Sequence, residues 1–237
     1  MEKTKLSMKD KLLNNSLYLI LLAILIITVI IEPKFVSFRN LTNILQMAST
    51  RSIIAMGISG LIIINGTDLS AGRVVGCCCA VSAALLQNPN YAAKMFKNMG
   101  EVPLIVGWLA SVLVAVVFAT IIGLCVSYLH MHAFIASLGM QLAAYGFLCL
   151  FMDSNGNNGQ PLSNLSDKYG NFVKGALDIG GVRIPYLIFY MIIVGVIMWL
   201  IWNKTILGKN MYAIGGNIEA ARVFGINVEK YIVLIFI

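Results

Sequence analysis

The fold is decided by residues 103–128, PLIVGWLASVLVAVVFATIIGLCVSY, a stretch that holds no charged side chain. A helix of this length extends about 39 Å, which is enough to cross the roughly 30 Å hydrocarbon core of a bilayer. Small residues recur in it at every fourth position, at Gly107, Ser111, Ala115, Ala119, Gly123 and Ser127. Because such a stripe lets two helix backbones approach closely in lipid, the stretch predicts a span packed inside a helix bundle.

The composition extends this prediction to the whole chain. Of 237 residues, 59% are hydrophobic and only 11% are charged, about half the charged share of a soluble domain. The long apolar runs are continuous rather than alternating, which favours helices whose backbone groups are bonded internally. We therefore predict an all-α, polytopic transmembrane helical bundle that forms a single domain over residues 1–237.

The apolar runs predict about six complete spans and the start of a seventh. The six predicted spans are 17–31, 44–64, 69–86, 103–128, 134–152 and 184–202. The final run, Tyr231 to Ile237, would rise only about 10 Å as a helix. We therefore expect the domain to be incomplete at its C-terminus.

Charge sets the predicted orientation. Four lysines precede the first span, at Lys3, Lys5, Lys9 and Lys11. Basic residues favour the cytoplasmic side, so the N-terminus is predicted to be cytoplasmic. Counting spans from there places residues 153–183 outside the cytoplasm, with a short surface helix within 165–177, and makes residues 203–230 a cytoplasmic loop.

Other chemistry is not indicated. The net charge of +7 is explained by topology and lipid headgroups, so nucleic acid is not an expected partner. The cysteines lack C-x-x-C spacing, and His130 and His132 would point apart on a helix, so neither a metal nor a cofactor is predicted. The sequence also shows no catalytic set of residues and no phosphate-binding G-x-x-x-x-G-K-[ST] loop.

Polar residues interrupt two apolar runs in the stretch GLIIINGTDLSAGRVVG, residues 60–76. Asn65-Gly66 predicts a helix stop, and Asp68 predicts the N-cap of the next helix. A facing ion pair between Asp68 and Arg73 is disfavoured, because the two positions lie about 140° apart on a helix. The alternative hypothesis is functional: Asn65, Thr67, Asp68 and Ser70 would line a transport path.

A second short helix is predicted inside residues 203–230. Asn217 is a natural N-cap, Glu219 suits the first turn, and Gly225 can end the helix in the left-handed conformation. Two turns are too few for stability alone in water. The helix therefore either connects two spans or docks on a partner, and the residues alone leave both open.

The side chains of this helix suggest how docking would work. Ala220 and Ala221 would allow close approach of a partner, while Ile218, Phe224 and Ile226 would offer apolar contacts.

These residues resemble permease subunits of ATP-binding-cassette monosaccharide importers, in the ribose, xylose and galactose branch. The family pattern G-x-x-x-x-A-I-G-G-N-x-x-A-A-x-x-x-G-I matches at Gly208, Ala213, Ile214, Gly215, Gly216, Asn217, Ala220, Ala221, Gly225 and Ile226. The family's N-L-x-N-I-L segment corresponds to residues 40–45, and its G-x-D-L-S-x-G turn to residues 66–72. The resemblance covers the whole chain, although the family continues for several more spans.

The resemblance implies a mechanism rather than an enzyme. Two permease subunits would form the pathway in the bacterial inner membrane, a separate ATPase subunit would hydrolyse ATP, and a periplasmic binding protein would deliver the sugar. The ATPase-docking (coupling) helix would comprise Gly216, Asn217, Glu219, Ala220, Ala221, Arg222, Phe224, Gly225 and Ile226. The wording G-T-D-L-S-A-G-R is most similar to the galactose branch, which implies galactose or methyl galactosides as cargo, with ribose or another monosaccharide as the alternative.

Three other classes of protein stay open on the residues alone. A secondary transporter or channel would need charges inside its spans, and only Arg51 hints at one. A membrane enzyme lacks a visible catalytic set. A purely structural membrane fragment is the third.

Overall fold

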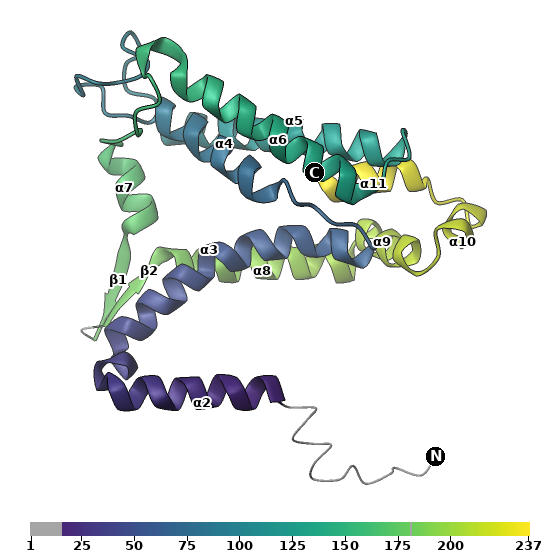
Figure 1. Ribbon diagram of the computed structural model, residues 1–237, viewed down its shortest axis with the longest axis horizontal. Coiled ribbons are helices and arrows are strands. Elements are labelled where there is room, and N and C mark those ends of the chain that lie inside the picture. Colours follow the sequence, from purple (N-terminus) through teal and green to yellow (C-terminus); the bar gives the residue numbers. More distant parts are fainter. Residues whose placement is uncertain (1–15, 181) are drawn as a thin grey trace.

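The computed structural model describes residues 16–180 and 182–237, which form a helical protein with one small hairpin (Figure 1). The N-terminal lysines used to orient the chain lie outside the described residues. The first described elements are α2 (Ser16–Ile31), the short 3₁₀ helix η1 (Pro33–Val36) and α3 (Phe38–Ile63). The apolar membrane fold predicted from composition is therefore helical, as expected.

Helix α3 begins earlier than the sequence predicted. The Ser37 Oγ accepts a hydrogen bond from the Asn40 N–H at 3.3 Å and so caps the helix. Residues 32–40, which lie between the first two predicted spans, are thus mostly η1 and the first turn of α3, and the start of the second span predicted at residue 44 is wrong by six residues. The helix starts here because Ser37 caps it, although the hydropathy of this first turn is low.

Three helices follow that match the predicted spans closely: α4 (Ala71–Leu85), α5 (Leu104–Ser127) and α6 (Ala133–Asp153). Helix α5 packs against α4 along its first half and against α11 (Val228–Phe236) along its second half. The stripe of small residues lies at these contacts. The Ser111 Oγ donates to the Cys78 carbonyl at 3.2 Å, and a Cβ on Gly123 would lie 3.0 Å from the Val233 Cα. The predicted packing role of the stripe is confirmed at these positions.

The predicted loop 153–183 holds more structure than expected. It contains η2 (Ser154–Gly156) and α7 (Asp167–Lys174), which is the expected short helix. It ends in strand β1 (Ala176–Ile179), which pairs antiparallel with β2 (Val182–Pro185). The hairpin was not predicted, although Gly180, with φ +60°, marks its turn.

The C-terminal part consists of α8 (Tyr186–Lys204), α9 (Ile206–Gly216), α10 (Ile218–Val223) and α11. Helix α9 was not predicted. It starts because the Thr205 Oγ accepts a hydrogen bond from the Gly208 N–H at 3.3 Å.

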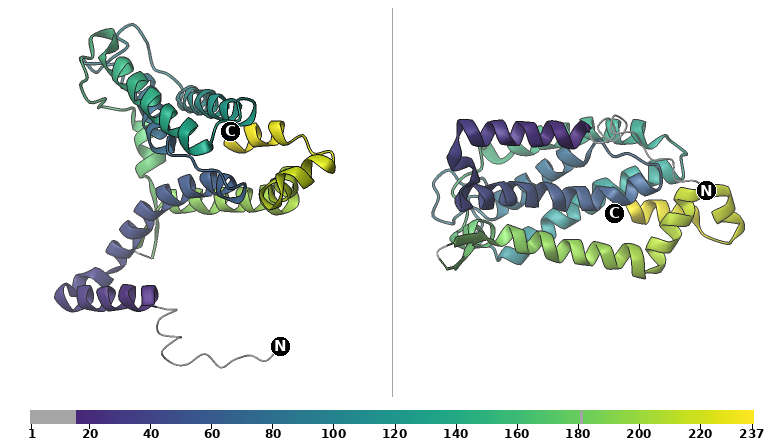
Figure 2. Two further views of the ribbon diagram at one scale, coloured as in Figure 1. Left: turned by 45° about the vertical axis from the view of Figure 1, so that its right-hand side comes forward. Right: turned by 90° about the horizontal axis from the view of Figure 1, so that it is seen from below.

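Most of the long helices belong to two groups, as the views in Figures 1 and 2 show. Helices α3 and α8 lie side by side, and α4, α5 and α6 form a second group. Helix α11 joins the groups, because it contacts both α5 and α3. Helix α2 lies apart and contacts the rest mainly through η1.

Four described helices, α3, α5, α6 and α8, are long and apolar enough to cross a membrane. Helices α2 and α4, with 16 and 15 residues, are also apolar but shorter, and 15 residues extend only about 22 Å. The chain is thus a multi-pass helical membrane protein, and the predicted count of six spans is not confirmed.

Gly208, in the first turn of α9, lies in close contact with the backbone at the end of α8. A Cβ at Gly208 would overlap the backbone carbonyl of Trp202, whereas a Cβ at Gly216, at the end of α9, would meet nothing within 4 Å. We expect Gly208→Ala to cost about 1–3 kcal/mol of stability through this overlap, seen as a lower melting temperature in detergent. Gly216→Ala is the matched control. Equal melting of the two variants would contradict the tight passage.

Candidate functional site at the α3–α4 break and the α9–α11 segment

Helix α3 ends in a closed turn. Asn65 takes the left-handed conformation, with φ +57°, directly after the last turn. The Asn65 N–H donates to the Ile62 carbonyl at 3.1 Å, and the Gly66 N–H donates to the Leu61 carbonyl at 2.8 Å. These are the two bonds of a Schellman motif. The helix stop predicted at Asn65-Gly66 is confirmed, and Asn65 rather than the glycine supplies the positive φ.

The carboxylate of Asp68 organises the start of α4. Its Oδ1 accepts hydrogen bonds from the Ser70 N–H at 2.7 Å and from the Ser70 hydroxyl at 2.6 Å. The helix itself starts at Ala71 with Ser70 at the N-cap position, so the prediction of Asp68 as N-cap is wrong by two residues. Asp68 binds the backbone as expected, but in the turn before the helix.

The four residues of the hypothetical transport path differ in accessibility. Asn65 and Thr67 are exposed, Asp68 is half-buried, and Ser70 is fully buried. The Ser70 hydroxyl is already bonded to Asp68. The break therefore offers Asn65, Thr67 and one edge of Asp68 to a solute, while Ser70 serves the turn.

Arg73 lies away from Asp68 and forms no ion pair with it among the described residues. Its guanidinium carbon is 4.7 Å from the centre of the Tyr145 ring on α6. This cation–π contact ties the first turn of α4 to α6.

Helix α10 is capped as predicted. The Asn217 Oδ1 accepts a hydrogen bond from the Ala220 N–H at 3.0 Å, Glu219 lies in the first turn, and Gly225 follows the helix with φ +80°. The six-residue helix is thus defined by its own end signals.

Arg222 fastens α10 to α11. Its guanidinium forms ion pairs with the Glu219 carboxylate at 3.1 Å and with the Glu229 carboxylate at 2.8 Å. The Glu229 backbone N–H and the Arg222 guanidinium lower the pKa of the Glu229 carboxyl. Arg222 therefore has a structural partner on each side.

The two faces of this segment are sharply different. Ala221 is only 2% exposed and packs with Ile214 and Val228, whereas Val223 and Phe224 are 85% and 84% exposed. Ile226 packs against the same buried cluster. Of the side chains expected to meet a partner, Phe224 points outward, Ile218 and Ala220 are exposed, and Ala221 and Ile226 face the protein.

The α3–α4 break and the α9–α11 segment are in direct contact. The Asn65 Nδ2 donates to the Gly215 carbonyl at 3.2 Å. A Cβ at Gly215 would overlap the Ile63 carbonyl, so the backbones of α9 and α3 touch at this point. On the other side, the Ser127 Oγ donates to the Glu229 carbonyl at 2.8 Å.

Comparison with protein families identifies the chain. Residues 40–237 match the family described as "Branched-chain amino acid transport system / permease component". The chain belongs to this permease family.

Individual relatives show how similar the chain is to galactose permeases and to ribose permeases. The permease is 40% identical to the galactose/methyl galactoside import permease protein MglC of Haemophilus influenzae, over 96% of this chain and 67% of the relative. It is also 40% identical to the Escherichia coli protein of that name, over 98% of this chain and 68% of the relative. The ribose import permease protein RbsC of H. influenzae is 30% identical, over 95% of this chain and 64% of the relative. No solved structure matches at a significant level.

The permease thus spans about two thirds of the length of these relatives. Among its described residues, no group of histidine, cysteine, aspartate and glutamate side chains could hold a metal ion.

The contact between Asn65 and Gly215 was not predicted, because no local pattern connects positions 150 residues apart.

The Asn65 junction gives a stability prediction. Asn65→Gly keeps the left-handed backbone and loses only the bond to Gly215, which costs about 0.5–1.5 kcal/mol. Asn65→Val adds the steric penalty of a branched side chain at positive φ, of about 1–2 kcal/mol. We expect the melting temperature to fall in the order native, Gly, Val. A valine variant as stable as the glycine variant would contradict the observed turn.

Proposed function

We propose that the chain is a permease subunit of a binding-protein-dependent ATP-binding-cassette importer, with galactose or a methyl galactoside as cargo. The observation that supports this cargo is the difference in sequence identity: 34–40% to galactose permeases against 29–30% to ribose permeases over nearly the same residues. The family description mentions branched-chain amino acids, whereas the individual relatives compared above are named as sugar permeases.

The proposed arrangement places the protein in the bacterial inner membrane with its N-terminus and the α9–α11 segment in the cytoplasm. A separate ATPase subunit docks on α10 and hydrolyses ATP. A second permease copy completes the pathway, and a periplasmic sugar-binding protein delivers the sugar to the outer loops, residues 153–183 among them. The exposed side chains of Val223 and Phe224 support the docking assignment, because large apolar groups this exposed outside the spans favour a partner.

The contacts around α10 suggest how docking reaches the pathway. Ala221 packs against Ile214, so α10 moves together with α9. Helix α9 in turn touches the end of α3 through Gly215 and Asn65. Displacement of α10 by the ATPase would therefore shift the α3–α4 break, where Asn65 and Thr67 are exposed.

Docking is tested at the exposed face of α10. Phe224→Asp should remove the main apolar contact and abolish co-purification with the ATPase of a galactose importer from mild detergent. Leu129→Asp, which places the same charge on an exposed apolar residue beyond α5, is the control and should retain the ATPase. Ala221→Glu is unsuitable, because it would bury a carboxylate among Ile214 and Val228.

Equal recovery of the ATPase with the native chain and with Phe224→Asp would exclude α10 as the docking helix. Loss with both variants would show an effect of added charge rather than of the α10 surface.

The path hypothesis is tested at Asp68. Asn keeps an acceptor oxygen for both bonds from Ser70, so Asp68→Asn should leave the amount of folded protein unchanged. If the carboxylate borders the sugar path, transport should slow by about ten-fold, the loss of one charged hydrogen bond. Unchanged transport, or loss of expression that Asp68→Ser restores, would leave Asp68 with a purely structural role.

A further inference from the structure

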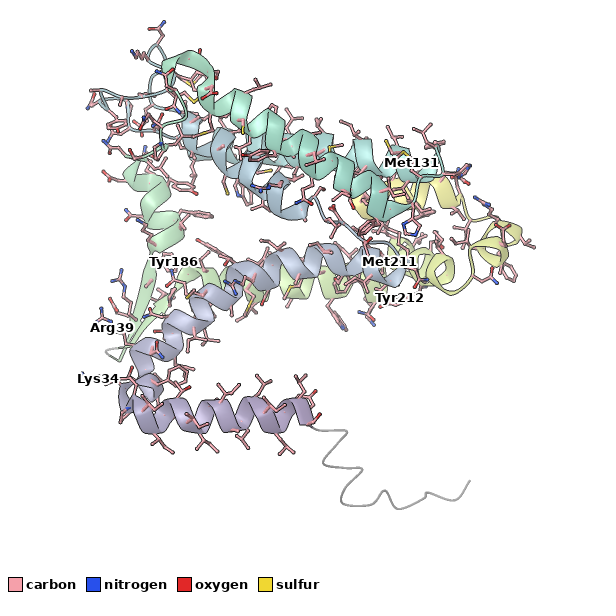
Figure 3. All side chains as sticks on the ribbon, viewed as in Figure 1. Lys34, Arg39, Met131, Tyr186, Met211 and Tyr212 are labelled. Atoms are coloured by element: carbon pink, nitrogen blue, oxygen red, sulfur yellow. The ribbon has the colours of Figure 1, made fainter. Side chains whose placement is uncertain are left out.

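A pocket of about 450 Å³ opens where the start of α3 meets the β1–β2 hairpin. It lies at the opposite end of the molecule from α10 (Figure 1). Three basic side chains from three elements line it: Arg39 of α3, Lys174 of α7 and Arg183 of β2. Figure 3 shows Arg39 at the start of α3, beside the hairpin.

The wall that α3 contributes is a continuous polar face. Arg39, Thr42, Asn43 and Gln46 all line the pocket, and their spacing of three, four and seven residues places them on one side of the helix. This helix is one of those apolar enough to cross a membrane. Polar and charged side chains gathered on one face at the end of a membrane helix suit a ligand whose charged group lies at the membrane surface.

The charges of this pocket are not balanced. Among the described residues no carboxylate lines the pocket, and none of its three bases takes part in an ion pair. Asp178 is the cross-strand partner of Arg183 in the hairpin, yet the two form no ion pair. Three cations that share one pocket repel one another, and a bound anion would offset that repulsion.

The position of the pocket is equally informative. In the proposed orientation this end faces away from the cytoplasm, where the topology rule gives no reason for basic residues. The exposed aromatic side chain of Phe38 lines the pocket together with these bases. The pocket thus combines a basic floor with an apolar border at the edge of a membrane helix.

We propose that this pocket binds the phosphate of an anionic phospholipid in the leaflet on this side. The guanidinium groups of Arg39 and Arg183 have the planar geometry that binds phosphate oxygens in pairs, and Lys174 adds a point charge. Asn43 and Gln46 suit hydroxyls of a glycerol headgroup, and Phe38 contacts an acyl chain. A monosaccharide is uncharged and would leave the three cations without a counterion, so the site is distinct from the sugar path.

The test compares two phospholipids that share acyl chains but differ in net charge. The purified, delipidated full chain is titrated with dioleoyl phosphatidylglycerol or dioleoyl phosphatidylcholine, and bound lipid is counted by native mass spectrometry. We expect a preference of about ten-fold or more for phosphatidylglycerol, since each basic residue adds to anionic-lipid attraction. The double variant Arg39→Gln, Arg183→Gln should lose this preference, and Lys174→Gln alone should reduce it.

The matched control is Lys209→Gln, Lys230→Gln, which removes two exposed bases at the far end of the chain and should keep the preference. Equal binding of the two lipids, or an undiminished preference in both pocket variants, would overturn the proposal. Binding of inorganic phosphate at least as tight as that of phosphatidylglycerol would assign the pocket to a free anion instead and would also overturn the proposal.

Discussion

A chain that leaves a helix beside a bilayer must still bond the backbone groups that it frees, since an unpaired group in hydrocarbon costs several kcal/mol. The segment between α3 and α4 meets this constraint with its own atoms. Asn65 and Gly66 close the end of α3, and the Asp68 carboxylate bonds the Ser70 N–H before α4 begins. Asn65 and Thr67 stay exposed beside this turn, and the Asn65 side chain donates to the Gly215 carbonyl of α9.

The rest of the fold holds this break in place by close backbone contact. Gly215 lets α9 touch the end of α3, and Gly123 lets α11 lie against α5. Where lipid supplies no hydrophobic drive between helices, such short distances between backbones determine which helices stay together. The α9–α11 segment is consequently bonded to both helix groups, through Asn65 on one side and Ser127 on the other.

Much of this was predictable from local patterns. The apolar runs located α4, α5, α6 and α8, and the end signals at Asn217 and Gly225 located α10, because spans and caps depend on nearby residues alone. The start of α3, helix α9 and the hairpin were missed, since each depends on a cap or a pairing that outweighs local hydropathy.

The orientation of side chains was the harder problem. Ala221 and Phe224 both suited a docking surface in the sequence, and only packing against Ile214 and Val228 shows that Ala221 faces inward. Likewise, Ser70 looked like a wall of the sugar path, but its hydroxyl is bonded to Asp68. Contacts with other residues determine which way such side chains face, and a local sequence pattern does not contain that information.

In the proposed function, this permease moves a galactoside when an ATPase subunit drives it. The most direct measurement is uptake of labelled methyl galactoside by proteoliposomes that hold the chain and the ATPase subunit of a galactose importer, with a galactose-binding protein and ATP supplied. Uptake that requires ATP, and that galactose suppresses more strongly than ribose, is the predicted result. Uptake no greater than in liposomes without the chain, or equal suppression by ribose, would contradict it.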